Sequence, residues 1–312
     1  MWFAAAPKAP PPSQKHIHSF WYYLRFVETV QLIECPRDAW QGLAPFIPTE
    51  VKVQYLSALL RVGFHTIDAG SFVSPKAVPQ MRDTKEVLDA LPWQDYPETG
   101  LLVIVVNQKG LEAAVAHPAV RYVGYPLSVS ETFQQQNARQ SIAEGEAFVS
   151  RLVETCQHAQ KVPVVYLSMG FGNPYGEPYS VQMVIEMGGR LAEKGVPILS
   201  LADTVGIATP DEVYATTAAV LQAIPSVKWG VHLHAAPQDM YAKIEAAWSA
   251  GVRRFDSALG GYGGCPFAGV PLVSNIRTET LLSFLREKGA LPPLNESALT
   301  EAQSLLPLAF AQ

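Results

Sequence analysis

The chain has 312 residues, of which 48% are hydrophobic and 16% charged, and its formal net charge is −5. This composition is ordinary for a globular enzyme with a large core, and it gives no support for nucleic-acid binding, which needs clustered lysine and arginine. No apolar run approaches the roughly 18 residues of a membrane-spanning helix, so we predict no membrane partner.

Residues 1–27 differ from the rest of the chain. They are rich in alanine and proline, and the first acidic residue of the chain is Glu28. An acid-free start could be a transit peptide, but Arg25 is its only arginine and the prolines oppose an amphipathic helix. We therefore expect a poorly ordered N-terminal extension over 1–27 and one folded domain over 28–312.

Short β-branched runs alternate with longer helical patterns from residue 29 onward, which indicates βαβ units and a parallel sheet. A helix-start signal over 209–212 and Gly63 at a helix end support the division. The expected strands are 29–34, 64–68, 101–106, 120–125, 163–168, 197–201, 228–232 and 253–256. The expected helices are 49–62, 79–91, 108–117, 131–160, 179–194, 210–223, 238–250 and 277–288.

Eight such units predict an α/β fold of the (β/α)8 TIM-barrel type, as a single domain with a C-terminal helical extension. A doubly wound sheet is the alternative. It would normally carry a glycine-rich phosphate loop after its first strand, whereas here residues 35–41 read CPRDAWQ. The barrel is therefore the favoured fold.

A His-Leu-His tripeptide, His232 to His234, stands at the end of the seventh expected strand. Residues i and i+2 of a strand point to the same face, so the two imidazoles can converge on one metal ion. Barrel enzymes place their chemistry at the carboxyl ends of the strands, and other reactive residues fall at those ends. They are Arg37, Asp38, Asp68, Asn107, Asp203, Thr204, Cys265 and Asn275. Carboxylate, imidazole and carboxamide groups on one rim suit a divalent cation.

Five segments of the chain carry a family resemblance: ECPRD at 34–38, GSFVSPKAVPQM at 70–81, LADTVG at 201–206, HLH at 232–234 and GGCPFA at 263–268. They resemble 3-hydroxy-3-methylglutaryl-CoA lyase, within the DRE-TIM metallolyase superfamily. The segment 70–81 and the GGCP loop are specific to the lyase branch and absent from the condensing relatives.

The resemblance implies a divalent metal, Mg²⁺ or Mn²⁺, an acyl-CoA substrate and a homodimer. It places the metal ligands on Asp38, His232, His234 and Asn275. It places catalytic roles on Arg37, Asp38, His232 and Cys265, and cofactor or substrate binding on Lys76, Asp68, Asp203 and Thr204. The chain departs from the family at Asp68, which stands in place of glutamate, and at Ala235, which stands in place of aspartate.

The chemistry that the resemblance implies is cleavage of a 3-hydroxyacyl-CoA to acetyl-CoA and a β-keto acid. A metal ion would chelate the substrate hydroxyl and carboxylate, and His232 or Asp38 would take the hydroxyl proton. Arg37 would stabilise the enolate oxygen, and Cys265 would protonate the enolate carbon. The odd, widely spaced cysteines indicate a reducing compartment, and we expect the cytoplasm.

Other interpretations of these residues remain open. Arg37 and Asp38 could form a salt bridge at the rim, Asp203 could cap the turn that follows it, Cys265 could be a small loop residue, and Lys76 could be a solvated lysine. The whole chain could also be a condensing enzyme or aldolase with the same metal site, or a barrel that has lost catalysis and serves as a binding protein.

Overall fold

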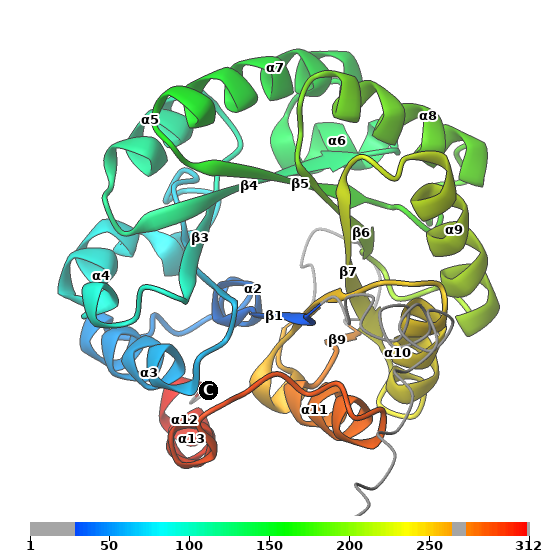
Figure 1. Cartoon of the computed structure of the whole chain (residues 1–312). Coiled ribbons are helices and arrows are strands. Elements are labelled where there is room, and N and C mark those ends of the chain that lie inside the picture. Colours follow the sequence, from blue (N-terminus) through cyan, green and yellow to red (C-terminus); the bar gives the residue numbers. More distant parts are fainter. Residues whose placement is uncertain (1–28, 264–272, 311–312) are drawn as a thin grey trace, which may run out of the picture.

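The computed structural model describes residues 29–263 and 273–310. In these residues eight parallel strands, β1 to β8, pair in sequence order, and the pairings of β1 with β8 and β6 with β7 close the sheet into a barrel. Figure 1 looks into the barrel and shows the helices as a ring outside it. The (β/α)8 prediction is confirmed.

The strands match the predicted ones to within a few residues, and most run further at their carboxyl ends. They are β1 Gln31–Glu34, β2 Thr66–Ser71, β3 Gly100–Ile104, β4 Val120–Ser128, β5 Val162–Ser168, β6 Ile198–Asp203, β7 Lys228–Ala235 and β8 Arg254–Ser257.

The helices follow the predicted order. They are α3 Thr49–Val62, α4 Thr84–Ala90, α5 Gln108–Ala116, α6 Glu131–Ala138, α7 Ile142–His158, α8 Val181–Glu193, α9 Pro210–Ala223, α10 Met240–Ser249 and α11 Thr278–Glu287. Short 3₁₀ turns lie at Pro79–Met81, Trp93–Asp95 and Leu259–Gly261.

The single helix predicted over 131–160 is wrong, because the structure has two helices there. Arg139 ends α6 with a left-handed backbone (φ 55°). Ser141 then begins α7 with a capping box, in which its side chain accepts from the backbone of Glu144 and the Glu144 side chain accepts in return. The S-x-x-E pattern at 141–144 is the sequence signal of such a start.

Two of the short elements that were not predicted carry site residues. Helix α2, Pro36–Trp40, follows β1 directly. Strand β9, Ser274–Asn275, pairs antiparallel with the end of β7, so that Asn275 lies opposite His234.

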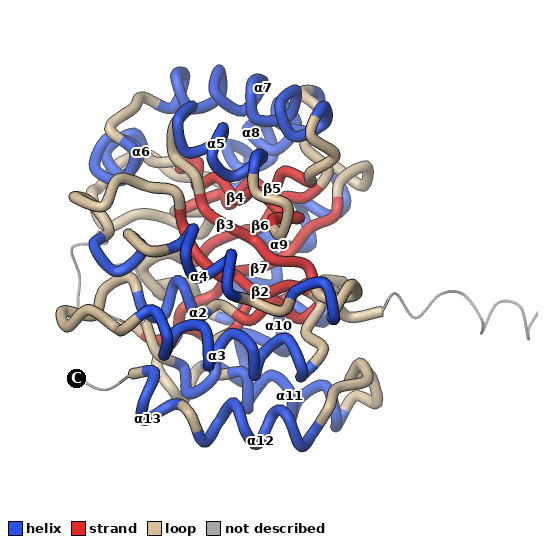
Figure 2. Tube along the Cα trace, turned by 90° about the vertical axis from the view of Figure 1, so that its left-hand side faces the viewer, coloured by secondary structure: helices blue, strands red, loops and turns tan. Residues whose placement is uncertain are grey.

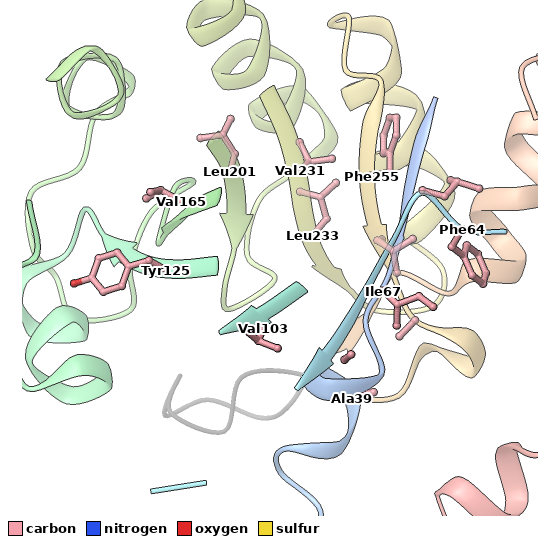
Figure 3. Close-up of a cluster of buried hydrophobic side chains, with 14 of the residues drawn as sticks. Ala39, Phe64, Ile67, Val103, Tyr125, Val165, Leu201, Val231, Leu233 and Phe255 are labelled. Carbon is pink, nitrogen blue, oxygen red and sulfur yellow. The ribbon is translucent and has the colours of Figure 1, made fainter. Parts of the chain in front are cut away.

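The hydrophobic core lies between the barrel and its helices. Figure 3 shows side chains from several strands that belong to this layer, among them Val231, Leu233 and Phe255, all of them at most 3% exposed. Because side chains alternate along a strand, the residues between these positions face the barrel interior. His232 and His234 therefore point inward, on either side of Leu233.

The C-terminal helices complete the outer layer beside α3. Helices α12, Glu296–Ser304, and α13, Leu306–Ala309, lie along that side of the barrel (Figure 2). The Trp40 indole nitrogen donates to the Ala309 carbonyl at 3.0 Å, which ties α2 to α13. Among the described residues, no helix is long and apolar enough to span a bilayer.

Candidate metal centre and active site

Asp38, His232 and His234 converge at the carboxyl end of the barrel. Asp38 lies on α2 and the two histidines on β7, and all three are buried. The Oδ2 atom of Asp38 is 3.9 Å from Nε2 of His232 and 3.9 Å from Nε2 of His234. One ligand atom from each residue falls within 4.8 Å of the other two, which is a spacing that can hold a metal ion.

The Nδ1 atoms of the two rings, which point away from Asp38, already have hydrogen-bond partners. Nδ1 of His232 lies 3.2 Å from Asp256 Oδ2, and Nδ1 of His234 lies 3.0 Å from the carbonyl oxygen of Thr204. Metal-binding histidines characteristically donate from one ring nitrogen to a carboxylate or carbonyl and ligate with the other. In both histidines the nitrogen left for a ligand is Nε2, which faces Asp38.

The Nε2 atom of His234 is buried and has no hydrogen-bond partner among the described residues. A buried polar atom without a partner costs about 1–3 kcal/mol, so such atoms call for an explanation. A cation between this nitrogen and Asp38 would satisfy it. The donor set of one carboxylate and two imidazoles therefore fits the divalent metal predicted from the sequence.

Asp38 is held as a carboxylate. Burial favours its neutral form, but the contact with His234 and the positive charge of Arg37 outweigh burial and hold the pKa of Asp38 well below its usual range. The hydrogen bond to Asp256 and the charge of Asp38 likewise outweigh burial at His232 and raise its pKa. Metal binding at this site therefore competes with protons as the pH falls.

Arg37 joins the metal cluster to Asp68 in a buried network. Its Nε donates to both Asp68 oxygens, at 3.2 and 3.0 Å, and its Nη1 lies 3.2 Å from Asp38 Oδ1. Burial disfavours the guanidinium charge, yet the two carboxylates outweigh it and raise the pKa of Arg37. Burial also raises the pKa of Asp68 to about 6. The salt bridge between Arg37 and Asp38 that the sequence left open is thus present, and it is buried and joined to Asp68.

Gln41 belongs to this network and was not predicted as a site residue. Its amide nitrogen donates to Asp38 Oδ1 at 2.8 Å, and its amide oxygen accepts from Arg37 Nη1 at 2.9 Å. Residues three and four apart share one face of a helix. Recognising Pro36 as the first residue of α2 would therefore have placed Gln41 beside both partners.

Asn275 lies against Asp38, as its predicted role requires. Its amide nitrogen donates to Asp38 Oδ2 at 2.9 Å and to the Tyr262 carbonyl at 2.8 Å. The adjacent Gly263 has a φ of +90°, and a Cβ there would meet the Ala39 Cα at 2.6 Å, so only glycine allows this close approach. A metal would be ligated by the amide oxygen instead, and the ligand role of Asn275 stays a prediction.

Arg37, Asp38, Asp68 and both histidines line one pocket, together with a set of apolar side chains. Thr204 lies on the pocket with the histidines, and its hydroxyl accepts from the Met169 backbone at 2.8 Å. The apolar part is contributed by Val73, Ala77, Val78, Ile104, Val106, Pro126 and Phe133. A pocket lined by both charged and apolar side chains suits an organic substrate that carries an anionic end.

The family model described as HMGL-like matches residues 29–306. The chain belongs to the HMGL-like family.

Relatives of this HMGL-like chain carry lyase names. Mitochondrial hydroxymethylglutaryl-CoA lyase of Mus musculus is 35% identical over 88% of this chain and 83% of its own length. Cytoplasmic 3-hydroxy-3-methylglutaryl-CoA lyase of Rattus norvegicus is 34% identical over 84% of this chain and 76% of its own. An HMG-CoA lyase from Acinetobacter baumannii, solved with coenzyme A and 3-methylmalate, has a TM-score of 0.82 at 32% identity over 90% of this chain and 92% of that one.

Asp203 was predicted to bind cofactor or substrate, and the structure directs its carboxylate elsewhere. Oδ2 of Asp203 is 2.7 Å from Nζ of Lys243, which comes from α10, and both side chains are at most 3% exposed. The Ala208 backbone nitrogen lies 3.3 Å from the same carboxylate, in keeping with the alternative that Asp203 caps its turn. Asp203 does not line the pocket, because it is held by the ion pair outside it.

The remaining predicted residues lie at or beyond the edge of the site. Lys76 is exposed, on the segment after β2 that also supplies Val73, Ala77 and Val78 to the pocket. Cys265 lies outside the described residues. The roles predicted for Lys76 and Cys265 remain predictions.

The last residue of β1, Glu34, gives a pH-dependent expectation. It is buried, accepts from the Leu259 backbone at 2.7 Å and from Thr278 Oγ1 at 2.6 Å, and burial raises its pKa from 4.5 to about 8. The folded state then holds a proton that the unfolded state releases between pH 4.5 and 8. As the pH rises through that window, ionisation of Glu34 should lower the free energy of unfolding by up to about 1.4 kcal/mol per pH unit.

A Glu34→Gln variant mimics the neutral acid and should lose this part of the pH dependence. Urea unfolding of both proteins at several pH values between 4.5 and 8 measures the difference in slope. Equal slopes in the two proteins would show that Glu34 is ionised in the fold.

Proposed function

We propose that this chain is a divalent-metal-dependent carbon–carbon lyase that cleaves 3-hydroxy-3-methylglutaryl-CoA to acetyl-CoA and acetoacetate. The observation that carries the proposal is the cluster of Asp38, His232 and His234, with two imidazole Nε2 atoms and one carboxylate aimed at a common point. Relatives at 34% and 35% identity bear the name of this activity.

The metal ligands in this proposal are Asp38, His232 and His234, joined by Asn275. When bound, Mg²⁺ or Mn²⁺ supplies Lewis acidity toward substrate oxygens. The Thr204 carbonyl and Asp256 fix the two rings so that neither has to reorganise when substrate arrives.

The carbon–carbon bond breaks as a base removes the proton of the substrate C3 hydroxyl. His232 and Asp38, the two candidates, both line the pocket. We assign this step to Asp38, because His232 has no free nitrogen once Nδ1 carries a proton and Nε2 binds metal. Arg37 lines the same pocket, and Asp68, Asp38 and Gln41 hold its guanidinium in place. A fixed cation stabilises the negative charge that develops on the thioester oxygen of the acetyl-CoA enolate. In this assignment the Cys265 thiol then protonates the enolate carbon.

Further parts of the proposal concern the chain's setting. We place the protein in the cytoplasm as a homodimer, in leucine degradation and ketone-body formation, with Lys76 near the CoA phosphates. One cytoplasmic and one mitochondrial relative stand among the proteins compared above.

Release of acetyl-CoA from hydroxymethylglutaryl-CoA, with Mg²⁺ or Mn²⁺ present, tests the proposal directly. We expect release that stops on chelation and returns on addition of metal. Absence of release despite bound metal would favour a condensing enzyme or aldolase, and a panel of 3-hydroxy-3-alkylglutaryl-CoA thioesters would then identify the substrate. Absence of metal binding would favour a catalytically inactive binding protein.

Replacing Cys265 with alanine tests the proton donor. General-acid catalysis contributes roughly 10²- to 10⁴-fold, so turnover should fall by at least about 100-fold. Metal content should stay the same, since the thiol is not among the proposed ligands. Turnover that survives the change would exclude Cys265 as the donor.

A further inference from the structure

Directly beneath the metal cluster, the barrel interior contains an ion pair between Arg254 and Asp256 of β8. Arg254 Nη1 lies 3.1 Å from Asp256 Oδ1, and the two side chains are 2% and 1% exposed. The residue between them, Phe255, points outward into the helical layer in Figure 3, so both charged residues face inward.

Asp256 uses its second oxygen on a proposed metal ligand. Oδ2 of Asp256 is 3.2 Å from Nδ1 of His232, while Oδ1 faces Arg254. The register of the two strands places Val231 opposite Phe255, which makes the inward-facing His232 and Asp256 neighbours. The carboxylate thus joins the guanidinium to the imidazole, and its charge requires Nδ1 of His232 to carry a proton.

The stability of the barrel does not explain this pair. Burying two charges costs desolvation that the ion pair only partly returns, and well-packed apolar residues of similar volume often serve as well or better. Arg254 is also incompletely satisfied, because its Nη2 is buried without a hydrogen-bond partner among the described residues. What the pair provides is a fixed acceptor for one ring nitrogen.

We propose that Arg254 and Asp256 are positioning residues that lock His232 as the Nδ1–H tautomer and so leave Nε2 free to bind metal. The assignment rests on the metal site of the proposed function. Arg254 has a distinct part in it, because its Nη1 donates to one carboxylate oxygen of Asp256 and so orients the other toward His232.

An Asp256→Asn variant tests whether the carboxylate oriented by Arg254 sets the tautomer of His232. Next to Arg254 the new amide is expected to turn its oxygen toward the guanidinium, so that its NH₂ group faces Nδ1. His232 would then accept at Nδ1 and carry its proton on Nε2, where it blocks the metal. We expect Mn²⁺ affinity to fall roughly 10- to 100-fold, as for other outer-sphere partners of ligating histidines.

Two measurements read the effect independently of catalysis. Mn²⁺ titration followed by electron paramagnetic resonance gives the affinity, and ¹⁵N chemical shifts of the imidazoles in the metal-free protein give the tautomers. His234, whose Nδ1 faces the Thr204 carbonyl, should keep its tautomer and serves as an internal reference. The matched control is Asp89→Asn, since Asp89 contacts His117 Nε2 at 3.0 Å away from the site and is 52% exposed.

A double variant, Arg254→Met with Asp256→Asn, separates positioning from folding. Without the guanidinium, the oxygen of the new amide is free to face Nδ1 of His232, so the Nδ1–H tautomer and most of the Mn²⁺ affinity should return. If Asp256→Asn does not fold, the double variant, which leaves no buried charge unpaired, decides the matter by itself.

The proposal is overturned if Asp256→Asn keeps both the His232 tautomer and the affinity, or if the double variant folds and lacks both. If the wild-type protein itself fails to bind Mn²⁺, the proposed metal function fails. The tautomer of His232 in the metal-free protein still reports on the positioning role in that case.

Discussion

Replacing His234 with alanine is expected to abolish metal binding and lyase turnover while leaving the barrel folded. His234 offers an Nε2 atom 3.9 Å from Asp38 Oδ2, and no other described group satisfies that atom. The loss of affinity should exceed the roughly 10- to 100-fold that follows loss of an outer-sphere partner. Because the change also removes an unpaired buried nitrogen, the free energy of unfolding should fall less than it does for a usual cavity-forming substitution.

Isothermal titration with Mn²⁺ and thermal unfolding followed by circular dichroism measure the two effects separately. The matched control is His158→Ala, because His158 is exposed at the end of α7 and should leave both measurements unchanged. Retention of Mn²⁺ binding by His234→Ala would remove this histidine from the ligand set and weaken the case for the whole site.

The strand-end residues were predictable because two rules act locally. Alternation along a strand predicts that His232 and His234 share one face of β7. Barrel enzymes place reactive residues at the carboxyl ends of their strands, which predicts that both histidines lie at the same end of the barrel as Arg37 and Asp38. Neither rule needs knowledge of distant contacts. That is why the metal cluster could be anticipated with its residues in place.

The parts of the site that sequence patterns missed depend on contacts between distant segments. The pairing of Asn275 with His234 requires the chain to return from β8 to β7 as a two-residue strand, too short for any periodicity to show. The bond between Asp256 and His232 joins two strands whose register appears only in the closed barrel. From the sequence alone, a polar residue in a strand is ordinarily predicted to face solvent. Only the closed barrel shows that Arg254 and Asp256 face the interior.

Lys243 is another residue whose surroundings depend on contacts between distant segments. A lysine on an outer helix would ordinarily be read as solvated, yet this one is 3% exposed at its side chain and donates to Asp203 Oδ2 at 2.7 Å. It also donates to the carbonyl oxygens of His234 at 2.9 Å and Gly206 at 3.1 Å. It thereby clamps the carboxyl end of β7 to the end of β6. The carboxylate that the sequence assigned to ligand binding serves this clamp.

Replacing Lys243 with methionine is therefore expected to lower the free energy of unfolding by about 3–5 kcal/mol, because the Asp203 carboxylate would be left buried without its counter-charge. Urea unfolding measures the change. The matched control is Lys288→Met, which breaks an exposed pair with Glu245 at 3.1 Å and should cost less than about 1 kcal/mol.

Addition of Asp203→Asn to the Lys243→Met variant removes the unpaired charge, so the double variant should regain part of the lost stability. Equal losses for Lys243→Met and Lys288→Met would contradict this account of the clamp. The same series also separates fold from site, because Lys243 touches His234 only through its backbone carbonyl. We therefore expect Lys243→Met to lower Mn²⁺ affinity only indirectly, through less order at the end of β7. In the double variant, Mn²⁺ affinity should recover together with the free energy of unfolding.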